Sequence, residues 1–575
     1  MSASSFYMMQ KKNTSNLEIL FQERNLTLEK ASELGRQYNA LLPISTLPLE
    51  LLLKIFHYDM VTHPGPGDPS AYLRSLSQVC HHWRNSALEA PFLWSQLVEC
   101  HCLPPKWFRV VLRRARSSPL RVTVLPLHGT GGKRYFTDPN VHQALRELGN
   151  IGELDILWSD EELDEIVRPM IKHLQRPAPS LKRLTVRFAD DDGDVTNIDI
   201  LRLPANIFCG VTGPLQHLTL SCCMIDIKSP LYHCLTSLSM EYIPESVKPS
   251  ISQFLDVLRI TPNLTTLSLT WALKPSTSVG RIEGVRLSRL SSLKVAGMSA
   301  ECSQFLSHLQ YTALHRFELR LDQLDPEQIN LSNLIKQPLS QIEPLRSCEV
   351  LMYERQIKFS SRRPGFEDEP GSALFYILLS WVPLAHIRTI FSSLITDISS
   401  WASHCEWLTL GLYPDALTVI WWDETFKCLA RAFSSVKTLE IKTVEWIPVD
   451  DFLCSVSYTE CEQPYSTISH DSTASKHIML PNLRNLYMNT KKPSPYLIAF
   501  LQYRRRCGLA IETIQFPKGF DHPWFVRDVK SLCSSVTVLS SDAPVAPVQE
   551  NSNTLFDNEA MEDADPELDY VAGKY

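Results

Sequence analysis

PSLKRLTVRF, residues 179–188, is one copy of a ten-residue pattern that decides the fold of this chain. Apolar Leu184 and Val186 alternate with Arg183, Thr185 and Arg187, as is typical of a strand with one buried face. An apolar residue also stands three positions before Leu184. Further copies of this pattern occupy residues 213–222, 233–242, 262–271, 288–297, 312–321, 403–412, 434–443, 481–490 and, more weakly, 509–518.

Helix-like segments lie between these copies, at 251–260, 423–433 and 496–506. A short strand followed by a returning helix leaves half of its core open until the next unit stacks on it, so such repeats form a solenoid. We therefore predict an α/β fold, an irregular leucine-rich-repeat horseshoe over 141–540 that is least regular between 340 and 400.

The polar strand positions would form the curved inner face that such solenoids offer to partners. Both signs of charge occur there and the net charge is −7, so the basic stripe of a nucleic-acid groove is missing. For any one of these residues taken alone, an ordinary solvated strand residue is the more common case. The candidates for contact with a protein partner are Arg183, Arg187, His217, Arg316, Glu318, Trp407, Glu440 and Tyr487.

Residues 47–56, LPLELLLKIF, carry more apolar surface than one small helix needs. A helix beginning at Pro48 turns about 100° per residue and so has two apolar faces. The face expected to serve the local core contains Leu49, Leu52, Leu53 and Phe56. The opposite face contains Leu47, Pro48, Leu51 and Ile55.

A second helical pattern occupies residues 71–90 and ends before Pro91, and bulky Leu93 and Trp94 follow it. A segment of about fifty residues buries little of its own surface, so this surplus of apolar side chains favours an interaction site.

Several of these residues together resemble the F-box motif over 45–98, and the later sequence is similar to the fungal family of F-box proteins with leucine-rich repeats. The residues that carry the resemblance are Leu47, Pro48, Glu50, Leu51, Ile55, Phe56, Val79, Cys80, Trp83, Arg84, Ala87, Pro91, Leu93, Trp94 and Leu97. The Pro/Gly-rich insert at 62–69 departs from the motif because it lengthens the connection between the helices.

The resemblance implies a small helical module that docks on the Skp-type adaptor of cullin-RING ubiquitin ligases. The residues that would form or buttress the adaptor-binding surface are Leu47, Pro48, Leu51, Ile55, Val79, Trp83, Leu93 and Trp94. For Trp83, core support and direct contact both stay open.

The function implied is that of the substrate-recognition subunit of an SCF-type ligase, with an unknown protein target and no catalysis by this chain. The alternative is a non-ligase scaffold or recognition protein that uses the repeat surface. No spacing of acids, bases or nucleophiles predicts an active site. GTGGKR at 129–134 lacks the first glycine and the final Ser or Thr of a phosphate-binding loop.

We also expect no metal, cofactor or membrane span, and a location in the cytoplasm, the nucleus or both. Cys-His-Cys at 100–102 has no second ligand cluster, and the start of the chain lacks the pattern of a secretory signal. Fifteen cysteines without such a signal predict free thiols.

An amphipathic helix is predicted from Asn16 to about Leu42, because residues 17, 20, 24, 27, 31, 34, 38 and 41 follow alternating steps of three and four. We expect this helix to pack against its own chain, with a self-associating coiled coil as the alternative that Arg24 and Thr27 weaken. The predicted organisation is a tail and helix at 1–42, the F-box at 43–98, a linker and solenoid cap at 99–140, the solenoid at 141–540, and an acidic disordered tail at 541–575.

Overall fold

The computed structural model describes residues 3–539 except for 63–68, 97, 101–102, 125–138, 160–170, 190–201, 211–214, 277–282, 325–329, 344–345, 354, 363–372, 384–385, 414–422, 443–451, 454–455, 457–477 and 490–492. The predicted acidic tail, the motif at 129–134 and most of the insert at 62–69 lie outside the described residues.

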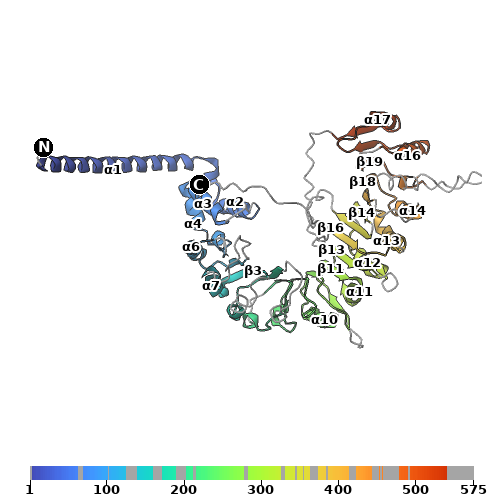
Figure 1. Ribbon diagram of the computed structural model, residues 1–575, viewed down its shortest axis with the longest axis horizontal. Coiled ribbons are helices and arrows are strands. Elements are labelled where there is room, and N and C mark those ends of the chain that lie inside the picture. Colours follow the sequence, from blue (N-terminus) through green and yellow to red (C-terminus); the bar gives the residue numbers. More distant parts are fainter. Residues whose placement is uncertain are drawn as a thin grey trace, which may run out of the picture.

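The chain forms an arch in which strands line the inner side and helices cover the outer side (Figure 1). One 17-stranded sheet runs along the arch through the described residues. Its strands, in spatial order, are β1 Val98–Glu99, β2 Leu120–Val124, β3 Ile151–Ser159, β4 Arg183–Ala189, β6 His217–Ser221, β8 Ser237–Glu241, β9 Thr266–Thr270, β11 Ser292–Met298, β13 Arg316–Asp322, β16 Ala373–Leu379, β15 Gln356–Arg362, β14 Ser347–Tyr353, β17 Trp407–Leu412, β18 Thr438–Lys442, β19 Asn485–Asn489, β20 Thr513–Phe516 and β21 Ser535–Val538.

The outer layer consists of helices and two short strand pairs. The pairs are β5 Arg202–Leu203 with β7 Met224–Ile225, and β10 Val285–Leu287 with β12 Leu309–Tyr311. The helices are α6 Pro105–Ala115, α7 Pro139–Arg146, α10 Ile251–Arg259, α11 Ser299–Ser307, α12 Leu331–Leu339, α13 Ile387–Ala402, α14 Asp423–Ala432, α16 Pro495–Arg506 and α17 Pro523–Lys530, with the short turns η2 Leu148–Asn150, η4 Ile207–Gly210 and η5 Pro230–Tyr232.

The ten-residue pattern sets the register of the sheet. Leu184, Leu218 and Leu238 lie opposite one another on neighbouring parallel strands and are at most 1% exposed. This ladder of buried leucines confirms the predicted α/β horseshoe, and the helices at 251–260, 423–433 and 496–506 are confirmed as α10, α14 and α16.

The sheet begins earlier in the chain than predicted. β1 and β2 lie within or beside the segment 99–140, which was expected to be a linker and cap, and they pair in parallel with each other and with β3. Val122 and Val124 are buried in the same core as the later repeats. The residue three positions before Val122 is Pro119 and not the leucine of the repeat pattern, so the sequence did not distinguish β2 from a cap.

The irregular stretch between 340 and 400 contains an antiparallel meander. β14 pairs antiparallel with β15, and β15 pairs antiparallel with β16. β16 also pairs in parallel with β13, and β14 pairs in parallel with β17. The strands here therefore do not follow their order in the chain. Phe359, Phe375 and Ile377 nevertheless remain buried, so the core continues through the meander.

The N-terminal module caps one end of the arch. It consists of η1 Pro43–Thr46, α2 Leu49–Thr62, α3 Pro69–Val79, α4 His81–Leu88 and α5 Pro91–Ser95. The single helix predicted over 71–90 is wrong, because Cys80 is extended at φ −156° and its thiol accepts a hydrogen bond from the Trp83 amide, which makes it the N-cap of α4.

The N-terminal helix α1, Ala3–Ala40, is longer than predicted and projects away from the arch (Figure 1). Its expected packing against its own chain is wrong, since Leu20 and Leu34 are each about 60% exposed. Among the described residues no helix is long and apolar enough to cross a membrane.

Candidate docking groove and inner face

A groove of about 730 Å³ opens on the surface of the N-terminal module. We call it the docking groove. The residues that line it come from the segment before α2, from α2, from α3 and from α4, and they are Leu47, Leu51, Lys54, Ile55, Phe56, Tyr58, Asp59, Tyr72, Leu76 and Trp83.

Helix α2 places two leucine-rich faces on opposite sides. The Pro48 carbonyl accepts hydrogen bonds from the amides of Leu51 and Leu52, which begins the helix. Leu52 is fully buried, while Leu51 and Ile55 are 47% and 45% exposed in the groove. Because one face already fills the core, the exposed face is available to a second polypeptide.

The predicted division of the two faces is wrong at one residue. Leu49 was expected in the core with Leu52 and Phe56, but it lies in the first turn of α2 and is 45% exposed. Met60, two turns beyond Leu53, is buried and extends the core face toward the end of the helix.

Trp83 forms one wall of the docking groove. Its ring lies 5.0 Å from that of buried Phe56, between centroids, and its side chain is half-buried. The residue therefore supports the core and also presents a face to the groove, which joins the two roles left open by the sequence.

Tyr72 and Asp59 provide a polar pair within the otherwise apolar groove. Burial raises the pKa of the Tyr72 phenol, and its hydrogen bond with Asp59 raises it further. This pair and Tyr58 were not among the residues predicted from the sequence. For Tyr58 a signal existed, since it stands three residues after Ile55 and seven after Leu51 on the same helix face.

The remaining predicted adaptor contacts lie elsewhere in the module. Pro48 is exposed at the start of α2, and Val79 is 58% exposed, but neither lines the groove. Leu93 and Trp94 are 0% and 1% exposed. They were expected to form or buttress the adaptor-binding surface, and their burial leaves only the supporting role, because a buried side chain cannot contact a partner directly.

Trp94 joins the module to the solenoid. Its indole N–H donates to the Ala87 carbonyl at 2.7 Å, and its ring lies 6.3 Å from that of Trp107 on α6. The Arg114 guanidinium, also on α6, lies 4.5 Å from the centroid of Trp94 and 5.5 Å from that of Trp107. These cation–π contacts help to hold the N-terminal module against α6.

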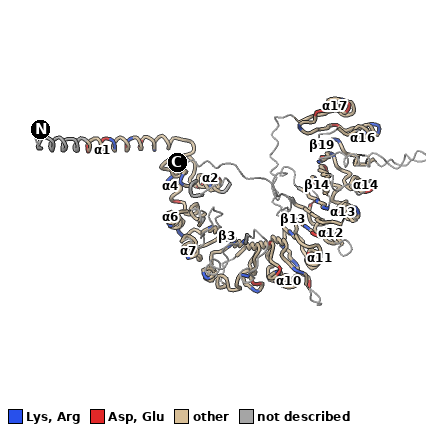
Figure 2. Tube along the Cα trace, viewed as in Figure 1, with Lys and Arg blue, Asp and Glu red and all other residues tan. Residues whose placement is uncertain are grey.

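The inner face of the sheet carries charges of both signs along its length (Figure 2). On β3 and β4, the Arg187 guanidinium donates to both carboxylate oxygens of Asp155 at 3.1 and 3.0 Å, and Arg183 lies 3.8 Å from Glu153. Burial lowers the pKa of His217 on β6, and the positive charge of Arg183 lowers it further.

A second polar group surrounds Glu318 on β13, which is only 9% exposed. Arg320 donates to its carboxylate at 2.8 Å, while Lys294 and Arg316 lie 3.7 and 3.9 Å away. Arg320 also stacks on the ring of Tyr376 at 5.2 Å. Glu318 is thus engaged by three cations of its own chain, and the cations are the more exposed members of the group.

A third group lies on β17 to β19. The rings of Trp407 and Tyr487 stack with centroids 5.4 Å apart across β18, and Trp407 is 37% exposed. Between them, Thr409 donates to the Glu440 carboxylate at 2.8 Å. The eight predicted partner contacts therefore share the inner face but form three separate groups, of which the aromatic pair offers the largest rigid apolar surface.

Residues 44–100 match the family model described as F-box-like, and this range contains every residue that lines the docking groove. No curated protein matches the chain. The leucine-rich repeat-containing protein LegL7 from Legionella pneumophila is similar in structure, with 13% identity, coverage of 62% of this chain and 93% of that chain, and a TM-score of 0.25. This TM-score is too low to carry an argument, so the solenoid class depends on the strand register.

Within the described residues, no group of three or more His, Cys, Asp or Glu side chains is placed to hold a metal ion.

Proposed function

We propose that this chain is the substrate-recognition subunit of an SCF-type cullin-RING ubiquitin ligase. In this proposal the docking groove binds a Skp-type adaptor, the inner face of the solenoid captures a target protein, and ubiquitin transfer is catalysed by other subunits. The proposal places the chain in the cytoplasm, the nucleus or both.

The observation that carries the proposal is the docking groove. Leu51 and Ile55 remain about half exposed on a helix whose opposite face is buried, and they line a groove inside the range that matches the F-box-like family. Burying an apolar side chain of this size contributes about 1.5 to 3 kcal/mol, so several such residues supply substantial binding energy.

The junction between the module and the solenoid also supports the proposal. A receptor that presents a captured protein to a ligase needs a fixed geometry between its two binding surfaces. The stacking of Arg114 on Trp94 and Trp107 provides a rigid contact at that point, and the covalent connection through β1 is short.

Two serine substitutions on one helix test the docking groove. Leu51→Ser removes a leucine that lines it, and Leu49→Ser removes one that is equally exposed but lies outside it. We expect Leu51→Ser to weaken binding of a Skp-type adaptor by about 30-fold or more, which corresponds to about 2 kcal/mol, and Leu49→Ser to change it less than threefold.

The measurement is a calorimetric titration of each full-length variant with the purified adaptor. Equal affinities for Leu51→Ser, Leu49→Ser and the unmodified chain would refute the assignment of the groove. Adaptor binding without ubiquitination of any protein held by the solenoid would instead identify a scaffold that uses the repeat surface outside a ligase.

A further inference from the structure

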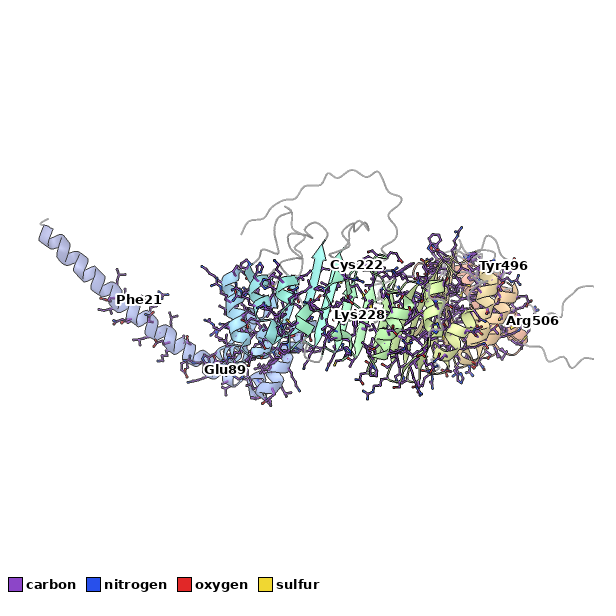
Figure 3. All side chains as sticks on the ribbon, turned by 90° about the horizontal axis from the view of Figure 1, so that it is seen from below. Phe21, Glu89, Cys222, Lys228, Tyr496 and Arg506 are labelled. Atoms are coloured by element: carbon purple, nitrogen blue, oxygen red, sulfur yellow. The ribbon has the colours of Figure 1, made fainter. Side chains whose placement is uncertain are left out.

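Helix α1 carries a continuous apolar face that no described part of the chain covers. Leu17, Leu20, Phe21, Leu28 and Leu34 are between 53% and 65% exposed. Figure 3 shows Phe21 on the projecting helix, away from the helices and strands of the arch. An isolated helix gains little stability in water without packing, so a face of this kind requires a partner.

We propose that a second copy of this chain covers the face, and that the two α1 helices pair antiparallel. The spacing of 17, 20, 24, 27, 31, 34, 38 and 41 in alternating steps of three and four is that of two paired helices. With the two-fold axis level with Glu29, Leu20 lies opposite Tyr38 of the second copy, and Leu17 lies opposite Leu41, the first residue after α1.

Arg24 decides the orientation. In a parallel pair it would face Arg24 of the second copy within the apolar seam, where two like charges repel each other. In the antiparallel pair it faces Leu34 instead, so the two Arg24 charges are separated along the seam. The aliphatic part of Arg24 then packs in the seam while its charge remains solvated.

Gly35 provides an independent argument for the same arrangement. A glycine inside a helix costs about 0.5 to 1 kcal/mol relative to alanine, and a Cβ at Gly35 would meet no atom within 4 Å in this chain. Packing within one protomer therefore does not explain it. In the antiparallel pair Gly35 and Phe21 of the second copy both flank the seam, two residues out of level with each other, and the missing side chain leaves room for the ring.

Sedimentation equilibrium of the full-length chain tests the pairing. We expect a dimer of about 131 kDa, twice the protomer mass of 65.5 kDa. Leu20→Ser and Leu34→Ser should each raise the dimer dissociation constant at least tenfold. Leu26→Ser is the matched control, because Leu26 is as exposed as the other two but stands outside the series of alternating three- and four-residue steps.

The proposal would be overturned by a chain that stays monomeric at concentrations up to about 50 µM. An equal effect of all three substitutions would also overturn it. The docking groove lies on other helices, so adaptor binding that survives in the monomeric variants would separate failure of the pairing from failure of the proposed function.

Cysteine cross-linking tests the orientation. The Leu17→Cys variant, the Leu41→Cys variant and an equal mixture of the two are each treated with a short bismaleimide. The unmodified chain is the control for native thiols such as exposed Cys209. The antiparallel pair predicts a new cross-linked dimer only in the mixture. A cross-link in Leu17→Cys alone, or none in a dimeric mixture, would overturn the arrangement.

A size exchange tests the contact between Phe21 and Gly35. Gly35→Phe should weaken the dimer at least tenfold, because two large rings then meet. Adding Phe21→Ala restores one large and one small residue at that position and should recover most of the affinity. A double variant no better than Gly35→Phe alone would refute this contact.

Discussion

Arg504 shows how a single buried cation holds the C-terminal end of the solenoid. It is 1% exposed, and its guanidinium donates to the carbonyls of Leu509, Met479, Leu480 and Leu483 at 3.1 to 3.2 Å. Burial lowers the pKa of Arg504 to about 10, which still leaves it protonated at neutral pH. One side chain therefore satisfies four carbonyls and ties α16 to the segment before β19.

We expect Arg504→Met to lower the free energy of unfolding by about 3 kcal/mol, because buried carbonyls lose their donors. Arg506→Met removes a neighbouring exposed arginine from the same helix and should change stability by less than about 0.5 kcal/mol. Urea denaturation followed by circular dichroism measures both. Similar losses in the two variants would show that Arg504 has no special role.

His142 on α7 and His173, in the helical turn 171–174, form a half-buried polar contact. His142 Nδ1 lies 3.0 Å from His173 Nε2, so one ring must donate and the other accept. Burial lowers the pKa of His173, and the charges of His142, Arg176 and Arg146 lower it further. A second proton would place two like charges in hydrogen-bond contact.

This pair predicts loss of stability on acidification. Because folding holds the pKa of His173 below its ordinary value of 6.5, the unfolded chain binds more protons as the pH falls through 6.5. The contribution is therefore fully present above that pH and decreases below it. We expect the melting temperature to fall between pH 7.5 and 5.5, and to fall less in His173→Asn. An identical fall in both proteins would contradict this account.

At the scale of elements, the junction of α5 with α6 depends on Trp94. Replacing this buried ring by alanine leaves a cavity and removes the surface on which Arg114 stacks. We expect Trp94→Ala to cost about 3 to 5 kcal/mol in the free energy of unfolding. Trp381→Ala is the matched control, since Trp381 is 60% exposed and should cost less than about 1 kcal/mol.

Chemical denaturation of both tryptophan variants provides the measurement. If Trp94→Ala were no more destabilising than Trp381→Ala, the junction would be held by other contacts. Hydrogen exchange across α5 and α6 would then show whether the module moves independently of the solenoid.

The repeating strands could be predicted because each has the same alternation as Leu184 and Val186. The meander of β14 to β16 could not, since parallel and antiparallel strands with one buried face share that alternation. The break between α3 and α4 was also hidden, because helical spacing continues through Cys80 while its thiol caps a new helix. In each case the local pattern of apolar residues was identified correctly, but that pattern does not determine the tertiary arrangement.

The residues of the candidate sites could be predicted from the sequence to different extents. The exposed stripe of Leu47, Leu51 and Ile55 follows from helical geometry, and the structure places all three in one groove. Burial of Leu93 and Trp94 did not follow, because a short apolar run looks the same whether it faces a partner or the first repeat. Contacts with α6, the next helix along the chain, decide that.

At the scale of the whole molecule, the arch holds its inner face as one continuous sheet from β1 to β21. The three polar groups on that face lie on different strands, so a captured protein could contact one group without reaching the others. The stacked pair of Trp407 and Tyr487 lies far along the sheet from the docking groove in strand order. Aromatic side chains of this kind are enriched among residues that dominate binding energy.

Under the proposed function, the stacking of Arg114 on Trp94 and Trp107 would influence which lysines of a captured protein are modified. With this junction held in place, the position along the sheet at which the captured protein binds would set the distance over which ubiquitin has to be transferred. A captured protein bound near β4 and one bound near β19 would then present different lysines to the same ligase.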